Sequence, residues 1–364
     1  MNQNTPVRPA VGGPMSPQPQ RDRELMTLML VALALLLLLL ALFVPVAWRR
    51  AKAEAAAWEQ AHPATEQTEE ETPADTSGSE TEHVSADVEP QLGNYISKST
   101  EATRTIGESD MDASHAILVD LTTGEAVAQR LADERIYPAS MTKIMTVLVA
   151  VEALTAAEME MTYTMTEDIV NAAIAEGASR AGFEPGEKVK LIDLLYGAAV
   201  SSGADATAAL ARYLTGTEEK YVELMNAKAQ KLGLTGTHFV NASGLHHDDH
   251  YSTVREIAAL MAYAMENETC RRLLSAASYT TAATEQHPYG ITLYSTTFSR
   301  MSTTTFGPVN VIAGKTGYTE EARFCLASLA TRPDGREYVL VTVGGSTKYA
   351  PVYDCDAVYG KYLF

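Results

Sequence analysis

Residues 138–154 read PASMTKIMTVLVAVEAL, an apolar run that follows a proline and carries one serine and one lysine near its start. Its length and periodicity predict a buried helix from Ser140 to Leu154. Ser140 and Lys143 then share a face, since residues three apart on a helix are neighbours. A helix N-terminus stabilises a developing alkoxide, and a neutral lysine amine can accept the serine proton. The pattern therefore indicates a serine nucleophile with its base, although an N-capping serine beside a surface lysine has the same spacing.

Apolar segments near both ends of the folded region predict strands. Residues 116–120 and 126–128 flank one turn, and residues 324–330 and 337–343 flank another at 332–335. Strands at both ends with helices between them are typical of an α+β fold. We expect one antiparallel sheet flanked by helices, with a helical subdomain between its two halves. The expected helices beyond the first cover residues 191–214, 218–232 and 352–363.

The chain ahead of this region changes composition twice. Residues 25–48 carry no charge, and a helix of that length spans a hydrocarbon core of about 30 Å. We expect an uncleaved transmembrane helix there, because a signal peptide has a shorter apolar run of ~7–15 residues; cleavage during export is the alternative. Residues 1–24 are expected to form a disordered tail. Residues 49–108 are rich in Glu, Thr and Ala and predict an acidic disordered linker, so the folded domain covers residues 109–364.

The composition excludes several classes of protein. The 364 residues carry a net charge of −18, with 28 Lys and Arg against 46 Asp and Glu, which disfavours sequence-unspecific nucleic-acid binding. Cys270, Cys325 and Cys355 form no C-x-x-C pair, which excludes a zinc ribbon and favours buried free thiols. Residues 246–250 read HHDDH, but adjacent side chains in a loop rarely converge on one ion, so we expect no metal there.

A second motif, AGKTGYT at residues 313–319, follows an apolar stretch. Lys315 and Thr316 supply a cation and a hydroxyl suited to a substrate carboxylate, and Gly317 lets the backbone of a ligand come close. K-T-G alone is also compatible with an ordinary strand end. Its position after S-x-x-K, with a helical region between the two motifs, is a rarer combination.

The region between the two motifs contains VSSGADA at residues 200–206. The triple SMTK, SGADA and KTGYT resembles the D-alanyl-D-alanine carboxypeptidases, which are low-molecular-weight penicillin-binding proteins of the serine β-lactamase/transpeptidase-like family. The resemblance covers residues 110–350. It includes GFEPGEK at 182–188, HFVNASGL at 238–245 and HYST at 250–253.

This resemblance implies a penicillin-sensitive serine acyl transfer that removes the terminal D-alanine from peptidoglycan stem peptides, with no metal or cofactor. Ser140 is expected to be the nucleophile, Lys143 the base, and Ser202 the group that passes a proton to the leaving amine. The backbone N–H groups of Ser140 and Tyr318 would form the oxyanion hole. β-Lactams would act as covalent inhibitors. The substrate lies outside the bacterial membrane, so the resemblance implies a cytoplasmic N-terminus and an extracytoplasmic catalytic domain. The residues expected to bind substrate are Lys315, Thr316, Gly317 and Tyr318.

Two positions depart from the family pattern. Ala204 stands where the middle motif usually carries an asparagine, whose amide would hydrogen-bond the acyl part of the substrate and help hold the lysine. Pro351 stands where some relatives place an arginine for the terminal carboxylate. A protein that binds wall peptides with little or no turnover is therefore the alternative function. A β-lactamase ranks lower, because no glutamate is recognisably placed to activate the deacylating water.

Overall fold

The computed structural model describes residues 95–364. The predicted tail at 1–24, the predicted transmembrane helix at 25–48 and residues 49–94 of the predicted linker lie outside the described residues. Within residues 95–364, the structure contains no helix that is both long and apolar enough to cross a membrane.

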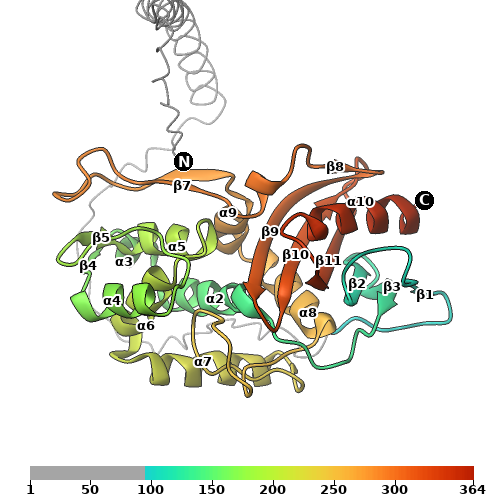
Figure 1. Ribbon diagram of the computed structural model, residues 1–364, viewed down its shortest axis with the longest axis horizontal. Coiled ribbons are helices and arrows are strands. Elements are labelled where there is room, and N and C mark those ends of the chain that lie inside the picture. Colours follow the sequence, from blue (N-terminus) through green and yellow to red (C-terminus); the bar gives the residue numbers. More distant parts are fainter. Residues whose placement is uncertain (1–94) are drawn as a thin grey trace, which may run out of the picture. The chain divides into compact units, whose positions relative to one another are not determined.

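The main sheet has the strand order β1-β3-β2-β11-β10-β9-β8 (Figure 1). β2 pairs with β11, so the two ends of the domain meet in one sheet as predicted. Every neighbouring pair is antiparallel except β1 and β3, which run parallel, so the sheet is mixed. Its strands are β1 (Arg104–Thr105), β2 (His115–Asp120), β3 (Glu125–Arg130), β8 (Thr305–Phe306), β9 (Val309–Thr319), β10 (Arg323–Thr331) and β11 (Glu337–Gly345).

Residues 98–108, predicted as linker, belong to the domain. The backbone of Lys98 forms an isolated parallel β-bridge with that of Glu125, and Ile106 is buried in an otherwise polar segment. Backbone hydrogen bonds between strands do not depend on side-chain type. The composition of this segment therefore gave no sign of the pairing, and the predicted start at residue 109 is too late.

Alternating side chains give the sheet two apolar faces. On β11, Val339 and Val341 join the larger core cluster, whereas Tyr338 and Leu340 join a second cluster. This follows from the two-residue period of a strand. Helix α8 (Val254–Glu266) covers the first face, and α10 (Ala350–Tyr362) covers the second (Figure 1).

The helical subdomain lies between β3 and β8 in the chain. The predicted helix 191–214 is in fact two helices, α5 and α6, because the chain turns at residues 200–203, where Ser202 has a φ of 64°. Two small two-stranded antiparallel sheets flank the helices, β4–β5 (Thr162–Thr164, Lys188–Lys190) and β6–β7 (Ser278–Thr280, Thr292–Tyr294). Besides α8, the helices between β3 and β8 are η1 (Ala139–Thr142), α2 (Lys143–Ala153), α3 (Ala156–Met159), α4 (Glu167–Ala175), α5 (Leu191–Ala199), α6 (Ala204–Thr215), α7 (Glu218–Lys231), α9 (Glu268–Ser275) and η2 (Phe298–Arg300).

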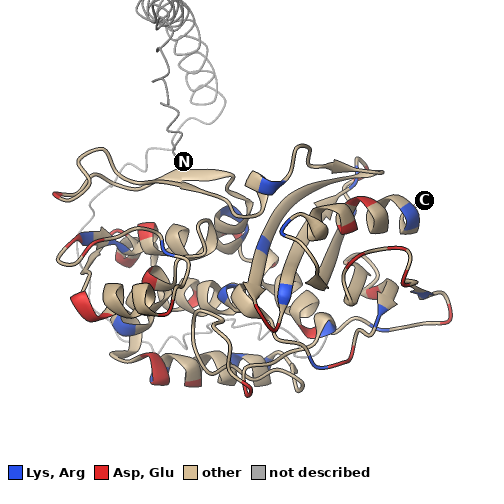
Figure 2. Ribbon diagram, viewed as in Figure 1, with Lys and Arg blue, Asp and Glu red and all other residues tan. Residues whose placement is uncertain are grey.

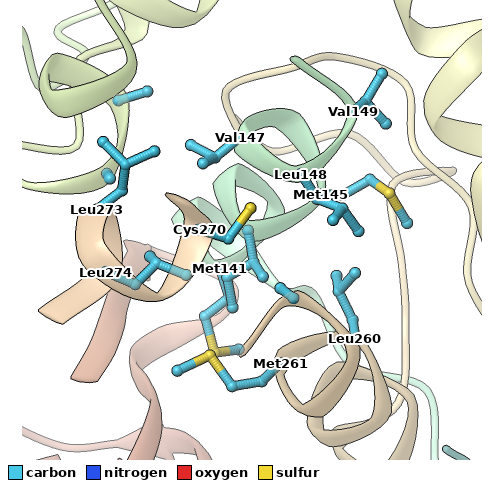
Figure 3. Close-up of a cluster of buried hydrophobic side chains, with 14 of the residues drawn as sticks. Met141, Met145, Val147, Leu148, Val149, Leu260, Met261, Cys270, Leu273 and Leu274 are labelled. Carbon is cyan, nitrogen blue, oxygen red and sulfur yellow. The ribbon is translucent and has the colours of Figure 1, made fainter. Parts of the chain in front are cut away.

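Helix α2 lies at the centre of the larger core. Figure 3 shows its apolar side chains among those of α8 and α9, and Met145, Val147 and Leu148 are fully buried. The predicted buried helix thus begins as the short 3-10 turn η1 and continues as α2. Close packing on all sides fixes the helix that carries Ser140 and Lys143. Cys270, Cys325 and Cys355 are buried free thiols, as predicted.

Candidate active site

A cleft of 580 Å³ opens where β9 meets the helical subdomain. Segments far apart in the sequence form its walls, among them η1 with the start of α2, the turn before α6, and β9. The structure brings together all seven residues that the sequence singled out. Ser140, Lys143, Ser202, Thr316, Gly317 and Tyr318 line the cleft, and Lys315 bonds to Ser202 in its wall.

Ser140 and Lys143 form a hydrogen-bonded pair. Lys143 Nζ lies 3.0 Å from Ser140 Oγ and donates to the Ser243 carbonyl oxygen at 2.5 Å. Lys143 is 2% exposed, and this burial lowers its pKa to about 7, against the opposing effect of the Asp205 and Glu218 carboxylates. Near neutral pH a substantial fraction of this lysine is uncharged and able to accept the serine proton.

Two glycines allow close packing around the nucleophile. A Cβ atom on Gly317 would lie 3.0 Å from the Pro138 carbonyl oxygen and 3.2 Å from the Ser140 nitrogen. A Cβ on Gly244 would lie 1.9 Å from the Ala139 carbonyl oxygen. The backbone at Ala139 itself has a φ of 46°, in the left-handed region that non-glycine residues rarely adopt. The conformation that presents Ser140 is thus held by its neighbours.

Ser202 and Lys315 form a second serine–lysine pair opposite the first. Lys315 Nζ donates to Ser202 Oγ at 2.8 Å and to the Thr316 carbonyl oxygen at 3.1 Å. Burial lowers the pKa of Lys315 well below its usual value, and the charges of Lys143 and Arg300 lower it further. The positive charge of Lys143 therefore disfavours the charged form of Lys315 across the cleft.

The position of the expected asparagine contributes only a methyl group to the cleft. The side chain of Ala204 lines the wall, while its backbone N–H donates to the Ser179 carbonyl. The adjacent carboxylate of Asp205 is no substitute, since it accepts the backbone N–H groups of Ala181 and Gly182. Asp205 thus fixes the 177–182 loop against α6 and leaves the cleft without a side-chain amide at this point.

Arg300 is a cleft residue that the sequence reasoning missed. It ends η2 and lines the cleft beside Thr296 and Thr316, whose hydroxyls are bonded at 2.7 Å. Its Nη1 atom is buried and has no hydrogen-bond partner among residues 95–364, and burial lowers its pKa. A desolvated guanidinium with free donors suits a carboxylate. The only signal in the sequence was a single arginine within a segment of serines and threonines.

The HHDDH segment has a structural role at His250. Val240 N donates to Nδ1 of His250, so Nε2 carries the proton and donates to Thr142 Oγ1 at 2.8 Å. Burial lowers the pKa of His250 to about 3, which keeps the ring neutral. The hydrogen bond from neutral His250 to Thr142 therefore stabilises the position of η1. In the described part of the chain, the structure places no three His, Cys, Asp or Glu side chains so that they could hold a metal ion.

The chain is similar to known proteins over most of the described region. The profile of a family described as D-alanyl-D-alanine carboxypeptidase matches residues 100–347. The chain is 34% identical to D-alanyl-D-alanine carboxypeptidase DacF of Bacillus subtilis over 236 residues, which are 65% of this chain and 58% of DacF. It is 40% identical to DacC of Escherichia coli over 164 residues, 44% of this chain and 41% of DacC. The chain thus spans little more than half of DacF and less than half of DacC.

The architecture is also that of a solved structure. The crystal structure of the Streptomyces K15 DD-transpeptidase superposes with a TM-score of 0.62 at 29% sequence identity. The superposition covers 69% of this chain and 97% of that protein. The described domain therefore has the penicillin-binding, transpeptidase-like fold.

Proposed function

Since the chain belongs to the D-alanyl-D-alanine carboxypeptidase family, whose members act on peptidoglycan, we propose that it removes the terminal D-alanine from stem peptides as a serine-type carboxypeptidase. One observation carries the proposal. Ser140 Oγ lies 3.0 Å from the amine of a buried lysine whose pKa is lowered to about 7, in the wall of an open cleft. This is the arrangement of a nucleophile with its base.

The proposed reaction proceeds through an acyl-enzyme. Neutral Lys143 takes the Ser140 proton as Oγ attacks the carbonyl carbon between the two D-alanines. Ser202 passes a proton to the leaving amine, and Lys315 orients its hydroxyl. The N–H groups of Ser140 and Tyr318 stabilise the oxyanion. Water then hydrolyses the ester: its hydroxyl adds to the acyl carbon, and its remaining proton passes through Lys143 to Ser140 Oγ as the ester bond breaks.

Arg300 binds the terminal carboxylate of the substrate in this proposal. Its unpartnered Nη1 and the Thr316 hydroxyl lie in the same cleft, and Pro351 supplies no donor at the position where some relatives place an arginine. This places the leaving D-alanine at the Arg300 end of the cleft. The acyl part of the peptide then runs past Ala204.

Binding without turnover is the second candidate function, and Ala204 favours it. Loss of a hydrogen bond to the acyl group slows the reaction by roughly 10- to 150-fold if that bond would stabilise only the transition state. A slower enzyme and a peptide-binding protein differ in whether D-alanine is released. β-Lactams are expected to acylate Ser140 in both cases.

The test uses the full chain in detergent and its Ser140→Ala variant. Each is incubated with a fluorescent penicillin and, separately, with diacetyl-Lys-D-Ala-D-Ala, while labelled protein and free D-alanine are measured. Labelling and D-alanine release that both disappear in the variant support the carboxypeptidase. Labelling without release favours the binding protein. An unlabelled wild-type chain would contradict both functions.

The proposal also includes the cell location. The uncharged run at residues 25–48 is long enough to anchor the chain in the bacterial membrane, with the catalytic domain on the extracytoplasmic side, where the substrate lies. Protease added to intact spheroplasts is expected to digest the domain. A domain that is digested only after lysis would contradict this orientation.

A further inference from the structure

Because position 204 carries no amide, other groups of the site must hold the Lys143 amine in place. Lys143 Nζ has two hydrogen-bond acceptors among residues 95–364, Ser140 Oγ and the Ser243 carbonyl oxygen. The hydroxyl of Ser140 leaves this set when it becomes acylated. The Ser243 carbonyl is then the remaining protein group that holds the lysine.

The backbone that carries this carbonyl is clamped on both sides. Ala242 N donates to Oε1 of Glu218 at 2.8 Å, and the Ala242 carbonyl accepts from Thr146 Oγ1 at 2.7 Å. Thr146 is part of α2, the helix that also carries Lys143. Glu218 is the first residue of α7 and reaches the Ala242–Ser243 segment from outside the core.

Glu218 also lines a small cavity behind the catalytic cleft. This cavity has a volume of 260 Å³ and shares two wall residues with the cleft, Ala204 and Ser243. Figure 2 shows the acidic residues of α4 and of the first turn of α7, which border the cavity together with α6. Ala204 therefore lies between the two spaces, and a longer side chain at this position would lie there as well.

We propose that Glu218 is a positioning residue that replaces the missing amide: through the Ala242 N–H it holds the Ser243 carbonyl on Lys143, and its charge lies behind the lysine amine. This inference rests on the proposed function, in which Lys143 is the base. It explains how the site keeps its lysine in place with alanine at position 204.

Four ionisable groups near Lys143 bear on the electrostatic part of the role proposed for Glu218. The pKa of Lys315 on β9 is lowered by burial and by the Lys143 charge, and His250 stays neutral. The carboxylates of Asp205 on α6 and Glu218 on α7 favour the charge. Three backbone N–H groups already bind Asp205, whereas one binds Glu218. Glu218 is therefore the carboxylate that can be altered without unfolding the 177–182 loop.

The test is a double-mutant cycle on the full chain, read by the second-order rate of labelling with a fluorescent penicillin. Glu218→Ala is expected to slow labelling roughly 10- to 100-fold in the natural background, because a hydrogen bond to a charged group is lost. In the Ala204→Asn background most of this loss disappears, since the amide holds the lysine again. Glu219→Ala, one residue along and exposed, serves as the matched control and labels at the wild-type rate.

The pH dependence of the labelling rate separates the effect of the Glu218 charge from the role of Glu218 in holding the Ala242–Ser243 backbone. Glu218→Gln keeps an acceptor for Ala242 N but removes the negative charge, so the acid limb of the labelling profile moves down by about one pH unit. Equal losses from Glu218→Ala in both backgrounds, or a profile for Glu218→Gln that superimposes on the wild type, would overturn the inference. If either of these two results is obtained while the wild-type chain is labelled normally, the inference about Glu218 falls and the proposed function stands. A wild-type chain that does not label would instead remove the proposed function.

Discussion

Lys315 Nζ lies 2.8 Å from Ser202 Oγ, and both side chains are buried between β9 and the turn before α6. The lysine thereby orients a hydroxyl that faces Ser140 across the cleft. Ser202→Ala is expected to lower D-alanine release by roughly 10²- to 10⁴-fold, the range for a positioned proton-transfer group. Ser201→Ala is the matched control, because the Ser201 hydroxyl donates to the Gly197 carbonyl within α5. Similar rates for the two variants would remove Ser202 from the mechanism.

The ionisation of Lys143 predicts how the rate of penicillin acylation depends on pH. Only the neutral amine accepts a proton, so the rate rises with pH and levels off above the Lys143 pKa of about 7. Lys143→Arg keeps the positive charge throughout this range and is expected to lose acylation at every pH. The measurement is the labelling rate from pH 5 to 9. A flat profile in the wild-type chain would contradict the assignment of Lys143 as the base.

The same pKa predicts an effect on stability. The folded chain releases the Lys143 proton near pH 7, whereas the unfolded chain keeps it up to the ordinary lysine pKa of 10.5. Because the unfolded state binds more protons between these values, the free energy of unfolding rises with pH there, by up to about 1.4 kcal/mol per pH unit. Denaturant unfolding of the wild type and of Lys143→Met at pH 7 and pH 8.5 isolates this contribution. The difference between the two proteins should change with pH in favour of the wild type.

The proposed role of Arg300 predicts a loss of selectivity for the terminal carboxylate. Arg300→Gln is expected to lower kcat/KM for diacetyl-Lys-D-Ala-D-Ala by roughly 10- to 100-fold. The rate for the corresponding peptide amide should change little, because the amide carries no charge to bind. Lys348→Gln, at another position of the same cleft, is the control. If Lys348→Gln abolishes the selectivity and Arg300→Gln does not, the carboxylate is bound at the other side of the cleft.

The sequence predicted those parts of the molecule that depend on local patterns. The helix with Ser140 and Lys143, the pairing of strands from both ends, and the free buried cysteines all follow from periodicity, turn residues and spacing. The break between α5 and α6 was missed because the apolar residues before and after it continue a helical pattern, although Ser202, with a φ of 64°, and the extended Gly203 interrupt the helix. β1 and Arg300 were missed for another reason. Their positions depend on tertiary contacts, a parallel backbone pairing and a buried guanidinium, that leave no periodic signal.

The contact between Gly244 and Ala139 predicts that the nucleophile is sensitive to a single methyl group. Gly244 has a φ of +80°, and a Cβ there would lie 1.9 Å from the Ala139 carbonyl oxygen and 3.0 Å from the Ser140 nitrogen. Gly335 has a similar φ of +85°, but a Cβ there would meet no atom within 4 Å. Gly335→Ala therefore measures the cost of the backbone conformation alone, about 1 kcal/mol.

Gly244→Ala carries the same conformational cost together with a collision against backbone that cannot move without displacing Ser140. We expect it to lower the free energy of unfolding by several kcal/mol more than Gly335→Ala does. It should also abolish penicillin labelling at temperatures where both variants remain folded by circular dichroism. Equal stability and equal labelling in the two variants would mean that the 241–245 segment can move away from η1. The left-handed conformation of Ala139 would then not depend on Gly244.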